Sequence, residues 1–204
     1  MTNIPTAPPG PPRLLARTAI ACLLGGLAIA IYVEVAGAAV ENPLRSTFSE
    51  YIYTEAGARL VGVAMLMVGF AALSLVGALV LGPLPGARAA SRLVGVFGVG
   101  LVLLAVFPQE PADMPLTWHG AIHRYVALTA FVALPLAALA LARAGRDRLL
   151  RFLAAGSLAT LVVFVATFVP LTDTREYSGL VERVLLAVDL VILAVVARRT
   201  ATAR

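Results

Sequence analysis

The sequence predicts an all-α integral membrane protein, a bundle of six transmembrane helices with both termini in the cytoplasm. Three observations support this fold class. The 204 residues are 60% hydrophobic and 13% charged, whereas soluble domains are about 45 to 50% apolar and about 25% charged. The apolar residues gather in six runs of near-membrane length. The sixteen basic residues, all of them Arg, are divided unevenly between the two sides of these runs.

The six runs set the organisation of the chain. They cover residues 18–40, 60–81, 93–107, 125–142, 152–171 and 184–197. Five prolines in the first twelve residues predict a disordered cytoplasmic tail over residues 1–16. A six-helix transmembrane domain over 17–199 and a short cytoplasmic tail over 200–204 follow. The first run also resembles a cleavable signal peptide, but its length and the interruption by Glu34 favour a retained helix.

The arginines predict the orientation. Eleven lie at the chain ends or between the second and third and the fourth and fifth runs, and five lie in the other connections. The side with more Arg faces the cytoplasm in multi-pass proteins. The pattern predicts a multi-pass protein of the bacterial inner (plasma) membrane, with membrane lipid as its surroundings. Because the net charge of +5 is scattered between apolar runs, it does not indicate a nucleic-acid partner.

Helix length predicts a polar cluster at the outer, extracytoplasmic end. The last run has fourteen residues, about 21 Å of helix, and is too short for a hydrocarbon core of about 30 Å. Starting that helix near Gly179, and the fourth near His119 or Gly120, brings charged groups of several helices to one depth. We expect a polar cavity there, lined by the ends of the second, fourth and sixth spans. Its candidate residues are Ser49, Glu50, Arg59, His119, His123, Arg124, Asp173, Glu182, Arg183 and Asp189.

Two histidines suggest a metal site. His119 and His123 are four residues apart, so on a helix both rings project from one face. With Glu182, or another outer carboxylate, they could hold Zn²⁺, which would activate a bound water for hydrolysis. The alternative is a hydrogen-bonded pair at the start of a helix, one ring capping the turn and the other pairing with a carboxylate.

Arg59, Arg124 and Arg183 could form a ring that binds a small anion or a phosphate-containing headgroup, because guanidinium groups match those oxygens. The alternative is internal pairing with outer carboxylates. Asp189 falls near the middle of the last span, where a carboxyl group needs a proton, water or a hydroxyl partner such as Ser74, Thr129 or Thr160. It is either a proton-coupling group or a hydrogen bond between helices.

Several short motifs carry a family resemblance. These are Ser49-Glu50-Tyr51 after the first span, Phe107-Pro108 after the third, His119-Gly120 with His123 at the fourth, and Gly179 with Glu182-Arg183 at the sixth. Over nearly the whole chain from about Arg17, the sequence resembles the prokaryotic membrane proteins of domain of unknown function 998. That resemblance implies a six-helix membrane fold. A remoter likeness is to ceramidase and adiponectin-receptor hydrolases, which use Ser, Asp and three His at zinc.

Three functions follow as hypotheses. The first is a protein that binds or moves a small anion or lipid headgroup in an outer cavity, with Asp189 coupling to protons. The second is a metal-dependent membrane hydrolase that uses His119 and His123 on a lipid-like substrate. The third is a structural or sensory membrane subunit whose charges satisfy one another.

Overall fold

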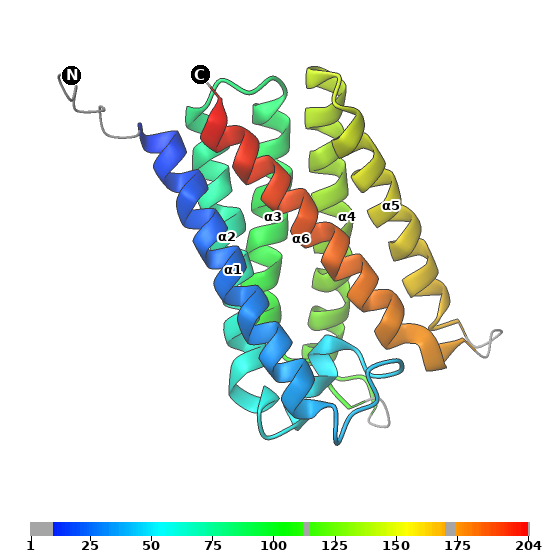
Figure 1. Ribbon diagram of the computed structural model, residues 1–204. Helices are drawn as coiled ribbons and strands as arrows, with labels where there is room; N and C mark the ends of the chain where they lie inside the picture. Colours follow the sequence, from blue (N-terminus) through cyan, green and yellow to red (C-terminus); the bar gives the residue numbers. More distant parts are fainter. Residues whose placement is uncertain (1–9, 112–114, 170–173, 204) are drawn as a thin grey trace.

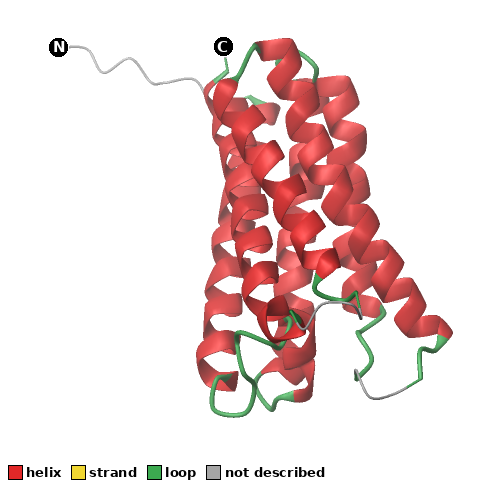
Figure 2. Cartoon of the chain, turned by 90° about the vertical axis from the view of Figure 1, so that its right-hand side faces the viewer, coloured by secondary structure: helices red, strands yellow, loops and turns green. Residues whose placement is uncertain are grey.

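The computed structural model describes residues 10–111, 115–169 and 174–203. Within these ranges the regular structure is entirely helical (Figures 1 and 2). The elements are α1 (Pro11–Gly37), η1 (Phe48–Tyr53), α2 (Gly57–Leu81), α3 (Ala87–Val106), α4 (Trp118–Gly145), α5 (Arg148–Ala166), η2 (Arg175–Tyr177) and α6 (Ser178–Thr202). The predicted all-α class is therefore confirmed.

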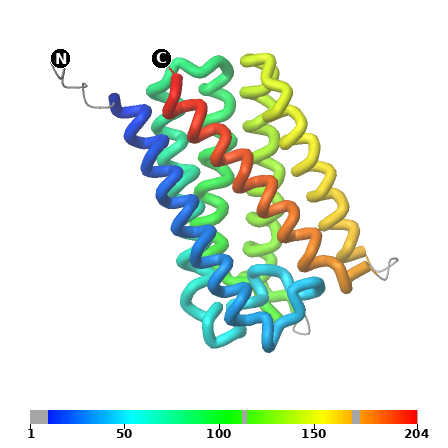
Figure 3. Tube along the Cα trace, in the orientation of Figure 1, coloured from blue at the N-terminus to red at the C-terminus, as the bar shows by residue number. Residues whose placement is uncertain are grey.

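The six long helices form a closed bundle in which each packs against its neighbours in the chain. Helix α6 closes it by packing against α1 as well as α5, and it crosses the bundle obliquely (Figures 1 and 3). Short connections, 82–86 and 146–147, join α2 to α3 and α4 to α5 at one end, which we call the short-turn end. The described parts of the longer connections, 38–56, 107–111, 115–117, 167–169 and 174–177, lie at the other, the long-loop end.

Helix length and hydropathy identify the membrane-spanning elements. Among the described residues, α1 to α5 are each long and apolar enough to cross a bilayer. Helix α6 has 25 residues but is not in that group, because its apolar stretch is interrupted by Glu182, Arg183 and Asp189. Large apolar side chains such as Phe152 and Val162 are strongly exposed, as lipid-facing residues are. The chain is a multi-pass membrane protein.

Each long helix begins before the apolar run that predicted it, while α1, α3 and α5 end before their runs do. Helix α4 begins at Trp118 and α6 at Ser178, within one residue of the starts that the length argument required. Helix α1 begins at Pro11, inside the tail assigned to residues 1–16. Proline fits the first turn of a helix, where no backbone N–H donor is needed, so a Pro-rich stretch here starts a helix. Likewise α6 continues to Thr202, into the segment assigned to the C-terminal tail.

Backbone geometry closes the short-turn end. Gly86 starts α3 with φ of 78°, a left-handed conformation that glycine adopts without penalty. The side chain of Asp147 caps α5 by accepting from the N–H of Leu150 at 3.1 Å, and it also forms an ion pair with Arg199 of α6. The turn between α4 and α5 is thus tied to the end of the last helix.

Candidate functional site

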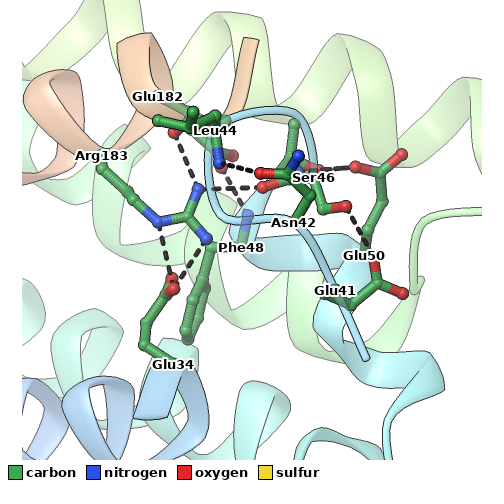
Figure 4. Close-up of polar contacts among 11 residues, drawn as sticks. Glu34, Glu41, Asn42, Leu44, Ser46, Phe48, Glu50, Glu182 and Arg183 are labelled. Carbon is green, nitrogen blue, oxygen red and sulfur yellow. Dashed lines mark hydrogen bonds and ion pairs between the residues drawn. The ribbon is translucent and has the colours of Figure 1, made fainter. Parts of the chain in front are cut away.

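Arg183, in the second turn of α6, organises the long-loop end. Its Nη2 lies 2.7 Å from the Glu34 carboxylate of α1, and its Nε donates to the same oxygen at 3.1 Å. Its Nη1 donates to the carbonyls of Ser46, at 2.9 Å, and Gly179, at 2.8 Å. The guanidinium also lies 5.4 Å from the centre of the Tyr51 ring. One side chain therefore joins the first helix, the first loop and the last helix (Figure 4).

The first loop is bonded to the start of α6 along its backbone. The Glu182 carboxylate accepts from the N–H of Phe48 at 2.5 Å and is buried. The other bonds run from the Leu180 N–H to the Leu44 carbonyl at 3.0 Å and from the Ser178 hydroxyl to the Arg45 carbonyl at 2.7 Å. We call this set, Glu34, Leu44 to Phe48, and Ser178 to Arg183, the loop–α6 junction (Figure 4). It fixes the loop over the end of the bundle.

Ser49 and Glu50 belong to the short helix η1. Glu50 accepts from the backbone N–H of Thr47 at 2.6 Å and from the Thr47 hydroxyl at 3.1 Å, which is a capping-box contact. Ser49 is buried and lies in the wall of the cavity described below. Burial, together with the nearby Glu34 carboxylate, raises the pKa of the Tyr51 phenol above its usual 10.0. Ser49, Glu50 and Tyr51 thus help to set the conformation of the first loop, which covers the site.

The two histidines have different surroundings. His123 is buried, and its Nδ1 lies 2.7 Å from the carbonyl of Phe107 at the end of α3. His119 is exposed and stacks on Trp118, with ring centres 3.5 Å apart. Thr117 caps this end of α4 by accepting from the His119 N–H at 3.2 Å. The pair lies at the start of α4, but the two rings do not share one environment as the spacing predicted: the ring of His123 is turned inward and that of His119 outward.

The arginines do not all face one site. Arg59 is exposed in the first turn of α2, and Arg183 is paired with Glu34. Arg124 is exposed and lines the cavity. Arg175, which was not among the candidates, also lines the cavity, and its guanidinium lies 5.8 Å from the centre of the Phe168 ring. Asp173 lies outside the described residues.

Asp189 is bonded to α5. Its Oδ1 accepts from the Ser157 hydroxyl at 2.7 Å, and both residues are buried. Its Oδ2 is buried without a hydrogen-bond partner among the described residues. The partner is a hydroxyl within the spans, as one of the alternatives predicted, but it is that of Ser157 and not one of the three named examples; the Thr129 and Thr160 hydroxyls donate to carbonyls in their own helices. An apolar sequence does not reveal which face of α5 turns inward, so Ser157 was missed.

A cavity of about 950 Å³ connects these groups. Its wall contains Ser49, His123, Arg124, Glu182, Arg183 and Asp189 from the candidate set. All six long helices contribute to it, including α1, α3 and α5, which the sequence did not assign to it. Most of its lining is apolar, for example Leu27, Ile31, Phe97, Leu128, Phe131 and Leu190. The charged groups are gathered at the long-loop end, and Asp189 lies deeper.

Glu34 is the most important residue that the sequence analysis did not place in the site. The available signal was a single carboxylate interrupting a long apolar run at about the depth of Arg183. Within the described ranges, no group of three His, Cys, Asp or Glu side chains is placed to hold a metal ion. The zinc site at His119, His123 and Glu182 stays a prediction.

The family assignment rests on a comparison with known protein families. Searches among curated proteins and among solved structures gave no match. The family model described as protein of unknown function (DUF998) matches residues 19–199, which include all of α2 to α5 and most of α1 and α6. The match also contains every motif from which the resemblance was inferred. The chain therefore belongs to the DUF998 family.

Proposed function

We propose that the protein binds a membrane amphiphile with a phosphate-bearing headgroup, holding the headgroup at the long-loop end and the apolar chain between the helices. The observation that carries this proposal is the cavity itself. Its volume, about 950 Å³, is at the upper end of the range of about 300 to 1,000 Å³ found for small-molecule sites. We call the opening of the cavity at the long-loop end, where its charged groups are gathered, the mouth. The apolar lining and the charged mouth favour a lipid-like molecule over a small inorganic anion.

The charges at the mouth support a phosphate as the polar group. The described residues contain no ion-pair partner for Arg124 or Arg175, whereas Arg183 is already paired with Glu34. Glu182 is buried and accepts from the Phe48 backbone. The exposed cations are thus the groups that an incoming headgroup meets first, and guanidinium groups bind phosphate oxygens well. In this proposal Glu34 and Arg183 hold the mouth in shape.

The proposal includes an arrangement in the membrane. Bonds join α1 and α6 at both ends, Arg183 to Glu34 at one and the Arg13 guanidinium to the Ala203 carbonyl, at 3.2 Å, at the other. The 21 residue steps from Arg13 to Glu34 span roughly 32 Å of helix, about the hydrocarbon thickness. Helix α6 is thus long enough to be a sixth membrane crossing. The Arg-rich short-turn end would face the cytoplasm and the cavity the outside of the inner membrane.

Lipid binding to matched variants tests the proposal. Protein purified in detergent is titrated with phosphatidylglycerol, and the bound fraction is measured by native mass spectrometry. We expect Arg124→Gln combined with Arg175→Gln to weaken binding about tenfold or more, since charge-assisted hydrogen bonds contribute about 1.5 to 3 kcal/mol. Arg59→Gln is the control, because Arg59 is an exposed arginine at the same end outside the cavity wall. Equal binding by all three proteins would refute the proposal.

A further inference from the structure

We propose that Asp189 forms a second polar subsite in the cavity, and that the bound amphiphile carries a hydroxyl group part-way along its apolar chain. This inference rests on the function proposed above and specifies the class of lipid. It starts from Asp189, which is 2% exposed and belongs to the cavity wall. Its nearest polar neighbour is Ser157 on α5.

Among the described residues, only one of the two carboxyl oxygens of Asp189 has a hydrogen-bond partner. Oδ1 accepts from the Ser157 hydroxyl at 2.7 Å, while Oδ2 is buried with no partner in the described part of the chain. A serine hydroxyl has one proton to donate, so Ser157 cannot serve both oxygens. A buried polar atom without a partner costs about 1 to 3 kcal/mol. This cost favours any ligand that brings a polar group to Asp189.

The cavity is the direction from which such a group can come. Ser157 of α5 bonds Oδ1, and the cavity borders the residue. Oδ2 has almost no accessible surface, so a ligand group reaches it when the carboxyl group turns toward the cavity. The surrounding wall is apolar, with Leu161, Leu186 and Leu190. An alkyl chain fits these neighbours, and a single polar substituent on the chain would find Asp189 as its partner.

A hydroxyl is the substituent that fits best. Because it both donates and accepts, it can pair with Oδ2 whether or not the carboxyl group carries a proton. A cationic amine would have to pass Arg124 and Arg175, which repel it. Along α6, Asp189 lies six residues beyond Arg183, roughly 9 Å of helix. Because Arg183 holds the mouth where Arg124 and Arg175 meet the headgroup, the hydroxyl is expected at about that depth below the mouth, several carbons into the chain.

A positional scan tests this inference. The probes are an unbranched alkyl phosphate and derivatives of it that carry one hydroxyl at successive chain positions, with binding measured at equilibrium to protein in nanodiscs. We expect one chain position to bind about tenfold more tightly than the unsubstituted probe. In Asp189→Leu this preference should disappear while the unsubstituted probe still binds. Thr160→Val is the control, because it removes another α5 hydroxyl, one that donates to the Gly156 carbonyl.

Each outcome is decisive. If every alkyl phosphate binds equally to the wild-type protein, the hydroxyl subsite is refuted and the headgroup site stands. If the preference survives in Asp189→Leu, the hydroxyl is recognised elsewhere and Asp189 is not the subsite. If no alkyl phosphate binds, both this inference and the proposed function fall. The scan with the wild-type protein alone can refute the inference even if Asp189→Leu does not fold.

Discussion

Glu34 and Arg183 lie 149 positions apart in the chain, yet they form the ion pair that links the first and last helices. Both side chains are about three-quarters buried. A partly buried charge that loses its partner keeps its desolvation cost and loses the compensating attraction. The pair therefore contributes more to the free energy of unfolding than an exposed ion pair with the same distance between its atoms.

Removing both members of this pair should destabilise the protein by less than the sum of the two single losses. We expect Glu34→Gln to lower the free energy of unfolding by about 1 to 3 kcal/mol, since it leaves the Arg183 charge unpaired. Arg183→Gln should behave similarly, and the double variant should lose less than the sum of the two. The coupling free energy between the two residues is measured with a double-mutant cycle, in which thermal unfolding of each protein is monitored in detergent. Glu55→Gln, at an exposed carboxylate of the same end, serves as control; strictly additive losses would contradict the expectation.

The sequence predicted which residues line the cavity better than it predicted the atoms to which these residues are bonded. His123, Glu182, Arg183 and Asp189 were selected because charged or titratable groups are costly in lipid, and all four line the cavity. Their partners Phe107, Phe48 and Ser46 contribute backbone atoms. A backbone donor or carbonyl is present at every residue, so the sequence carries no sign of which one is used.

The start of α6 leaves no room for a side chain at Gly179, where an added Cβ atom would collide with the Ser46 carbonyl oxygen. A Cβ atom on Gly179 would lie 2.7 Å from the Pro43 carbonyl oxygen and 2.8 Å from Arg183 Nη1. Contacts this short do not occur in stable packing, so the loop approaches α6 closely because this residue has no side chain. The Gly179 motif of the sequence is thus explained by the loop–α6 junction.

Substitution at this glycine should open the junction. We expect Gly179→Ala to destabilise the protein by about 1 to 3 kcal/mol, the usual cost of overpacking, and to increase proteolysis in the loop at 38–56. Gly156→Ala on α5 is the matched control, since its added Cβ meets nothing within 4 Å and alanine is the better helix former by about 1 kcal/mol. If the two variants were equally stable, close packing at Gly179 would not be important.

The start of α4 has a pH-sensitive cap. Glu110 accepts from the Thr117 hydroxyl and from the Thr117 N–H, the latter at 2.9 Å, and these bonds lower the pKa of Glu110 below its usual 4.5. A carboxyl group with a lowered pKa in the folded state stabilises the fold above the unfolded pKa, and this contribution is lost as the pH falls through the folded value.

Thr117→Val should therefore reduce the acid dependence of stability. We expect the variant to lose less stability than the wild-type protein between pH 5 and the acid limit of folding, with the melting temperature followed against pH from about 6 to 3. Thr117→Ser keeps the hydroxyl and should behave like the wild-type protein. Identical pH profiles for Thr117→Val and the wild-type protein would show that the cap does not contribute.

Over the whole molecule, the number of crossings and the sidedness are the features to test. Single cysteines are introduced into a Cys22→Ser background at Glu55 and Tyr177, at the long-loop end, and at Arg146 and Thr202, at the short-turn end. Labelling of intact cells with a membrane-impermeant thiol reagent should reach Glu55→Cys and Tyr177→Cys only. Labelling of Thr202→Cys together with Tyr177→Cys would show that α6 does not cross.

The sequence could predict the bundle because apolar run length is a direct consequence of bilayer thickness. It could predict that the starts of the fourth and sixth helices lie at one end and line one cavity, since both had to be extended to span the hydrocarbon core. It could not predict that α1, α3 and α5 help to form the cavity, because their inward faces are as apolar as their lipid-facing ones. In a membrane protein both sides of a helix are apolar, so periodicity does not identify the buried face.

The ion pair between the first and the last helix also has a consequence for biogenesis. During synthesis Glu34 enters the bilayer long before the ribosome has made Arg183, so its charge has no stable partner until translation is almost complete. A chain that stops before α6 keeps an uncompensated carboxylate near lipid and an untethered first loop. Truncated products should then be recognised and degraded by membrane quality-control proteases, while the full-length chain, once α6 has docked, hides that signal.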